Sequence, residues 1–74
     1  MTKREADRHN WKVITNVATA LIENRMVDVP KFLTNAQYAW ENIGMYIQAA
    51  NIAREAMNMP KLYLIDLNEL EEED

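Results

Sequence analysis

The residues best suited to chemistry are Glu5 and His9, which lie four positions apart near the start of the chain. On a helix this spacing puts both side chains on one face, where they could supply two metal ligands or a general base with its orienting carboxylate. A metal site needs a third ligand, and none stands at helical spacing from this pair. The commoner role of a Glu and His at this spacing is a weak surface contact, and we expect that role here.

Other catalytic groups are scarce. The chain has no Ser and no Cys, which leaves four Thr as hydroxyl nucleophiles, and two of these are better explained as helix caps. The only Gly, Gly44, lies inside a predicted helix and cannot belong to a phosphate-binding loop. Either another helix packs closely against it or it has no structural role. The sequence therefore predicts a protein that is not an enzyme, with no catalytic, cofactor-binding or metal-binding residues.

Charge is distributed unevenly along the chain. Residues 1–33 carry six Lys or Arg against four Asp or Glu, whereas residues 34–74 carry two against eight. Arg4, Arg8 and Lys12 recur every four residues and would form a basic stripe on one helix face, from which three or four phosphate contacts are possible. No recognition helix follows, and the acidic second half would repel DNA. A small DNA-binding regulator that uses this stripe is the alternative function, and a solvated face is the default interpretation.

Two capping boxes predict where the long helices begin. Thr2 is followed three residues later by Glu5, and Thr34 by Gln37, so that each Thr can accept from the third helical amide while the acid or amide side chain reaches back. Apolar periodicity then predicts helices over about 3–24 and about 35–58.

The predicted connector covers residues 25–33. Asn24 is expected in the left-handed conformation that ends many helices. Pro30 is expected to hold Val29 extended, because the residue before a proline is disfavoured in the helical region. Residues 26–29 would then form a short β-prone stretch or an irregular loop.

Residues 61–67 follow Pro60 as a nearly continuous apolar run. Three structures are open for them: a strand beside residues 27–29, an arm that crosses a partner subunit, or the lead into a short helix capped by Asp66. We favour an extended arm or strand packed on the helices, because an isolated two-stranded ribbon is marginal in water. Residues 68–74 form an acidic tail.

The second long helix has an apolar arc of roughly 200°, whereas one neighbouring helix covers a stripe of about 100°. The C-terminal segment or a second molecule must therefore cover the surplus. The predicted fold is mainly α: one helical domain over residues 1–67, built as an antiparallel helical hairpin with a short extended C-terminal segment, which dimerises into a four-helix bundle.

The expected function is that of a small non-enzymatic interaction protein, a regulator or inhibitor of the kind that phages and mobile elements encode. Its expected partners are a second copy of itself and another protein, whose surface it covers. The absence of an apolar run of 18 residues predicts no membrane contact and a cytoplasmic location, in the host cytoplasm if the protein is viral. The residues expected in the interface are Trp40, Ile43, Tyr46, Ile47, Ala50, Arg54, Met57, Tyr63 and Ile65.

The C-terminal sequence Leu64-Ile65-Asp66-Leu67, followed by acidic residues up to Asp74, resembles a SUMO-interacting motif. The resemblance implies that the segment adds a strand to the edge of a partner's sheet, while the acids meet a basic rim. It covers about eleven residues of the chain.

Overall fold

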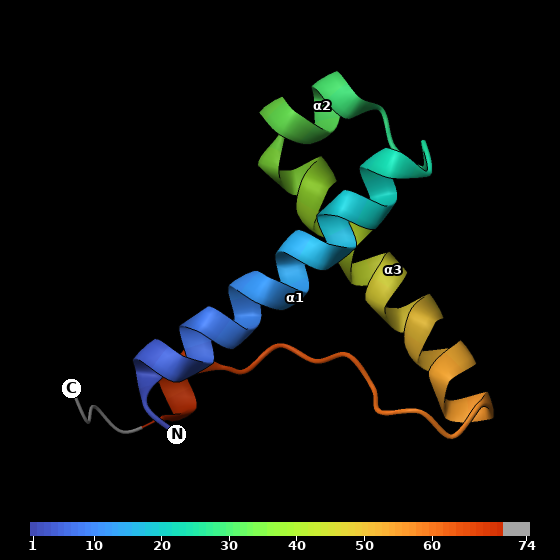
Figure 1. Ribbon diagram of the computed structural model, residues 1–74. Coiled ribbons are helices and arrows are strands. Elements are labelled where there is room, and N and C mark those ends of the chain that lie inside the picture. Colours follow the sequence, from blue (N-terminus) through green and yellow to red (C-terminus); the bar gives the residue numbers. More distant parts are fainter. Residues whose placement is uncertain (71–74) are drawn as a thin grey trace.

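The computed structural model describes residues 1–70 of the 74-residue chain. This part of the chain is mainly helical and contains a pair of long helices, as the sequence predicts. Its elements are α1 (Lys3–Glu23), α2 (Val29–Thr34), α3 (Ala36–Ala56) and the single 3-10 turn η1 (Leu67–Glu69). In Figure 1 the two long helices cross near the end of α1, and residues 57–66, which we call the strap, run back from the end of α3 to the start of α1.

The start of α1 confirms the first capping box. The Glu5 amide donates to Thr2 Oγ1 at 3.1 Å, and the Thr2 amide donates to Glu5 Oε1 at 3.1 Å. Hydrogen bonding of the Glu5 carboxyl to Thr2, first to its amide and then to its side chain, lowers the pKa of this carboxyl because it favours the charged form. At the other end, the expectation for Asn24 is wrong: its φ is −91°, and the left-handed residue is Arg25, with φ 56°.

The expected cap of the second long helix is wrong by one residue. The Asn35 side chain, rather than Thr34, accepts the Tyr38 amide at 3.0 Å. Thr34 is still helical and belongs to α2, where its hydroxyl donates to the Pro30 carbonyl at 2.7 Å. Asn is as good an N-cap as Thr, so the neighbouring position was equally suited to begin the helix.

The connector expected over 25–33 contains α2, which the sequence did not predict. Residues 26–28 before it are irregular, so of the two alternatives for 26–29 the β-prone stretch is wrong and the irregular loop holds as far as Asp28. The Asp28 side chain caps this helix by accepting the Lys31 amide at 3.1 Å. Val29 is its first helical residue and Pro30 its second, so Val29 is not extended. Proline is tolerated in the first helical turn because an amide there has no intrahelical partner.

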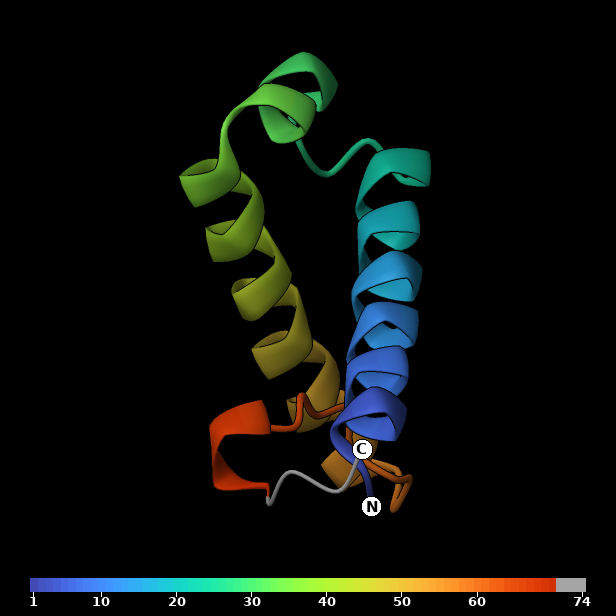
Figure 2. The ribbon, with the colours of Figure 1, turned by 90° about the vertical axis from the view of Figure 1, so that its left-hand side faces the viewer.

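The buried core is small. It consists of Ala6 and the cluster Val13, Val17, Leu21, Phe32 and Ile43, all at most 8% exposed. Trp11 of α1 is 57% exposed. The molecule measures 39 × 34 × 16 Å, and the side-on view shows α1 and α3 side by side across its thin dimension (Figure 2).

The strap is extended but forms no strand within residues 1–70, and it lies at the opposite end of the molecule from residues 27–29 (Figure 1). The strand pairing considered for these two segments is therefore wrong. Asp66 does cap a short helical turn, because its side chain accepts the Asn68 amide at 2.9 Å at the start of η1. Of the predicted acidic tail, residues 71–74 lie outside the described residues. No described helix is long and apolar enough to span a membrane.

Candidate interaction surface

Two asparagine side chains hold the strap by its main chain. The Asn10 amide group donates to the Ile65 carbonyl at 2.8 Å and accepts the Ile65 amide at 2.7 Å. Asn51 binds Leu62 in the same way, at 2.8 and 2.7 Å. A carboxamide offers a donor and an acceptor side by side, as a neighbouring strand would. The strap therefore obtains strand-like hydrogen bonding from one residue of α1 and one of α3.

Two further side chains contact the same segment. His9 Nε2 lies 3.1 Å from the Tyr63 carbonyl oxygen, and the His9 ring stacks on the Tyr63 ring with centroids 4.6 Å apart. Arg54 Nη1 donates to the Pro60 carbonyl at 3.0 Å. The Glu5 carboxylate accepts from the Thr2 amide instead of pairing with His9. His9 and Arg54 thus belong to the strap, and no described group of three His, Cys, Asp or Glu could hold a metal ion.

The structure divides the nine predicted interface residues between the interior and the surface. Ile43 is 5% exposed and lies in the core, with Tyr46 and Ile47 packed beside it. The half-buried residues also include Ala50, Arg54 and Ile65, while Trp40, Met57 and Tyr63 are 51%, 62% and 56% exposed. The inner arc of α3 therefore serves mainly to pack the chain against itself.

The side of α3 that faces away from α1 carries an apolar strip beside its exposed polar residues Glu41, Gln48 and Glu55. Met45 is 66% exposed and Ile52 is 72% exposed. Ala49, which lies between them along the helix, and Ala56, which lies one turn after Ile52, are also exposed. Ile52 comes nine residues after the buried Ile43, which places the two on opposite sides of the helix at 100° per residue. We call Met45, Ala49, Ile52 and Ala56 the α3 outer face.

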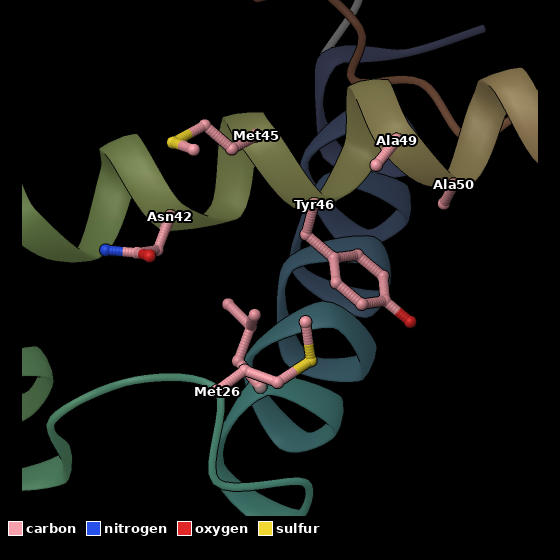
Figure 3. Close-up of a pocket in the computed structure, with 7 residues that line it drawn as sticks. Met26, Asn42, Met45, Tyr46, Ala49 and Ala50 are labelled. Atoms are coloured by element: carbon pink, nitrogen blue, oxygen red, sulfur yellow. The ribbon is translucent and has the colours of Figure 1, made fainter.

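A groove runs beside this face, between α3 and the end of α1. Its volume is about 520 Å³ and its lining is Leu21, Met26, Asn42, Met45, Tyr46, Ala49 and Ala50. Figure 3 shows Tyr46 pointing from α3 toward the side on which Met26 lies, whereas Met45 lies at the opposite edge of the helix. The outer face and the groove thus form one continuous apolar surface.

The residues of the predicted basic stripe, Arg4, Arg8 and Lys12, are all exposed on α1. Arg8 and Lys12 border a shallow hollow together with His9, the residue that contacts Tyr63 of the strap. The SUMO-interacting resemblance falls on the strap itself. Because both main-chain groups of Ile65 are bonded to Asn10, strand addition at this residue requires the strap to leave α1.

The sequence reasoning missed Asn10 and Asn51. A signal for Asn10 was present, since it lies on the same stripe of α1 as the buried Ala6, Val13 and Val17. A carboxamide on an apolar stripe needs partners there, because buried polar groups are hydrogen-bonded. The outer face was missed because the projection of the helix showed a wide apolar arc without showing which part α1 would cover.

No protein-family model, curated protein or solved structure matches the chain. The function is therefore argued from the geometry of the strap and of α3.

Proposed function

We propose that this protein is a small non-enzymatic interaction module, a regulator or inhibitor that acts in the cytoplasm by covering the surface of another protein. The observation that supports this proposal is the α3 outer face, an apolar strip on a helix whose other side is already packed. Contiguous apolar surface beyond that of an ordinary monomer marks interaction sites. An apolar strip beside an apolar groove suits a partner that presents a helix. The proposal includes the homodimer, in which two helical hairpins associate into a four-helix arrangement.

The test is site-specific photo-crosslinking in the cells that make the protein. A photoreactive residue replaces Ile52 in one version and Thr19, which is exposed on α1, in the other. We expect discrete protein adducts from position 52 and few from position 19. Equal, non-specific labelling from both positions would overturn the proposal.

The DNA-binding alternative gives a different result. It predicts retention of the purified chain on DNA that falls steeply with salt and is lost when Arg8 and Lys12 are both replaced by Ala. Such retention, without protein adducts at position 52, would favour the basic stripe over the α3 outer face.

A further inference from the structure

The strap is held by its main chain more than by its side chains. Asn10 binds the amide and the carbonyl of Ile65, and Asn51 binds the same two groups of Leu62. Every residue except proline carries these two groups, so the contacts do not select the sequence of the strap. None of the strap's residues, all of which the structure describes, lies in the buried core, and Tyr63 is 56% exposed. Asn10 and Asn51 are therefore suited to hold any extended main chain that reaches both of them.

The spacing of the two held residues indicates which conformation this site accepts. Leu62 and Ile65 are half-buried and three positions apart, and the two residues between them are exposed. A β-strand would place residues three apart on opposite faces. Polyproline II repeats every three residues and makes no internal hydrogen bonds, so its main-chain groups are free to bond to neighbouring side chains. The site thus suits an extended segment with apolar side chains at positions i and i+3.

The strap leaves part of this site unfilled. A pocket of about 160 Å³, which we call the Leu62 pocket, is lined by Val13, Asn16, Val17, Tyr46, Arg54 and Leu62. Leu62 is only half-buried, and a Phe side chain has more apolar surface to bury in the same place. Protein interiors are close-packed, so a side chain that fits a pocket leaves little space beside it. The Leu62 pocket is therefore larger than the side chain that the strap places in it.

We infer that Asn10, Asn51 and the Leu62 pocket form a binding site for an extended peptide segment of another protein, and that the strap is its internal competitor. The segment carries a bulky aromatic side chain at the position of Leu62 and an aliphatic one at the position of Ile65. A short tether gives the strap an effective concentration on the order of millimolar, so a free segment must compete with it. A segment that fills the Leu62 pocket competes better than the sequence of the strap. The site is separate from the α3 outer face, so the inference goes beyond the proposed function.

The first experiment follows the isotope-labelled wild-type chain by NMR while an unlabelled synthetic peptide is added. The peptide has the sequence of residues 59–67 with Leu62→Phe. We expect the main-chain amides of Leu62 and Ile65 in the chain to shift to the positions of an unstructured segment. The side-chain amide signals of Asn10 and Asn51 should stay at their bonded positions, because the peptide replaces the strap on them. A peptide that keeps Leu62 should need a roughly fourfold higher concentration, since one buried methylene contributes about this factor.

Two methylated peptides provide the matched control. Methylation of the peptide nitrogen at Ile65 removes the donor that Asn10 accepts, and it should abolish the competition. Methylation at Leu64, whose amide donates no hydrogen bond within residues 1–70, should leave the competition intact.

The second experiment removes the competitor. Leu62→Asp combined with Ile65→Asp places two charges where the strap is half-buried and should release it. Fluorescence anisotropy of the dye-labelled peptide should then give binding about tenfold or more tighter than to the wild type. Adding Asn10→Ala to this released chain should weaken binding roughly 30-fold, because the peptide loses two hydrogen bonds. The control is Thr19→Ala, an exposed position on α1, which should leave binding unchanged, and circular dichroism verifies that each variant keeps its helices.

An unchanged wild-type spectrum at millimolar peptide, together with no binding to the released chain, would overturn the inference. So would equal binding of the two methylated peptides, or binding to the released chain that does not depend on Asn10, because the peptide would then lie elsewhere. The proposed function fails separately, since adducts from position 52 report on the α3 outer face and not on the site of the strap.

Discussion

The side chains of Asn10 and Asn51 each make two hydrogen bonds to the main chain of the strap, and we call these two pairs of bonds the clasps. They give the most direct test of how this chain folds. Replacing Asn10 by Ala removes both hydrogen bonds to Ile65, which are partly buried. A typical intramolecular hydrogen bond contributes about 0.5–1.5 kcal/mol net, so the variant should lose about 2 kcal/mol where the strap meets α1. That loss corresponds to roughly a 30-fold larger equilibrium constant for opening of the strap. Asn51→Ala should have a similar effect at Leu62.

The assay is amide hydrogen exchange measured by NMR, because each clasp covers one identifiable amide. The Ile65 amide is bonded to Asn10 Oδ1 and the Leu62 amide to Asn51 Oδ1, both at 2.7 Å. In Asn10→Ala the Ile65 amide should exchange roughly 30-fold faster, in line with the expected loss. The matched control is Asn16→Ala, also on α1, which makes the same change in helix propensity without removing a hydrogen bond to the strap.

The response of Leu62 shows how far the strap opens. If the strap leaves as one unit, the Leu62 amide also accelerates in Asn10→Ala, and the double variant costs less than the sum of the two single ones. If it opens locally, Leu62 stays protected. Fast exchange of Ile65 already in the wild type, equal to that in Asn10→Ala, would refute the reasoning, because the clasps would then not hold the strap in solution.

The remaining predictions concern the helices. Gly44→Ala should raise the free energy of unfolding by about 1 kcal/mol in denaturant titrations, because a Cβ there meets nothing within 4 Å; a destabilised variant would reveal a neighbour at this position. Asn35→Ala should lower the free energy of unfolding by about 1 kcal/mol in the same titrations, because Asn35 caps α3. Thr34→Ala should lower it by less. A larger loss in Thr34→Ala than in Asn35→Ala would show that Thr34 is the cap. Acidification should loosen the start of α1, because folding lowers the pKa of the Glu5 carboxyl. The ionised carboxyl therefore stabilises the folded chain fully above its usual pKa of 4.5, and this stabilisation is lost as the pH falls through the lower pKa of the folded state. NMR titration of the Thr2 amide checks this, and Glu5→Gln should remove the pH dependence.

Local sequence signals predicted the long helices well, because periodicity and capping act within a few residues. The box at Thr2 formed as expected, and two helices of matched length followed. The errors arose where two local signals competed. Pro30 indicated extended backbone for the residue before it, but Asp28 supplied a cap and placed this proline in a first helical turn.

The position of the strap depended on contacts that no local pattern carries. Asn10 and Ile65 are 55 residues apart in sequence, and their pairing requires α1, α3 and the turn after α3 to be in place. The wide apolar arc of the second long helix did predict that a third element was needed. It could not show that Arg54 and Tyr63 would make contacts within the chain while Ile52 stays exposed. Which side chains the chain itself contacts depends on the angle at which the long helices cross.

The strap and the α3 outer face are coupled through the second half of α3. Ile43 is the only residue of α3 in the described buried core, so the turns beyond Ala50 are held mainly by the Asn51 and Arg54 bonds to the strap. The same turns carry Ile52 and Ala56. A partner on that face should stabilise them, since a ligand that binds only the folded state raises stability with its concentration. In Asn51→Ala the melting temperature should therefore rise with protein concentration more steeply than in the wild type, and it should not rise in Asn51→Ala combined with Ile52→Glu. Parallel curves for all three proteins in calorimetry at several concentrations would show that the strap and the outer face act independently.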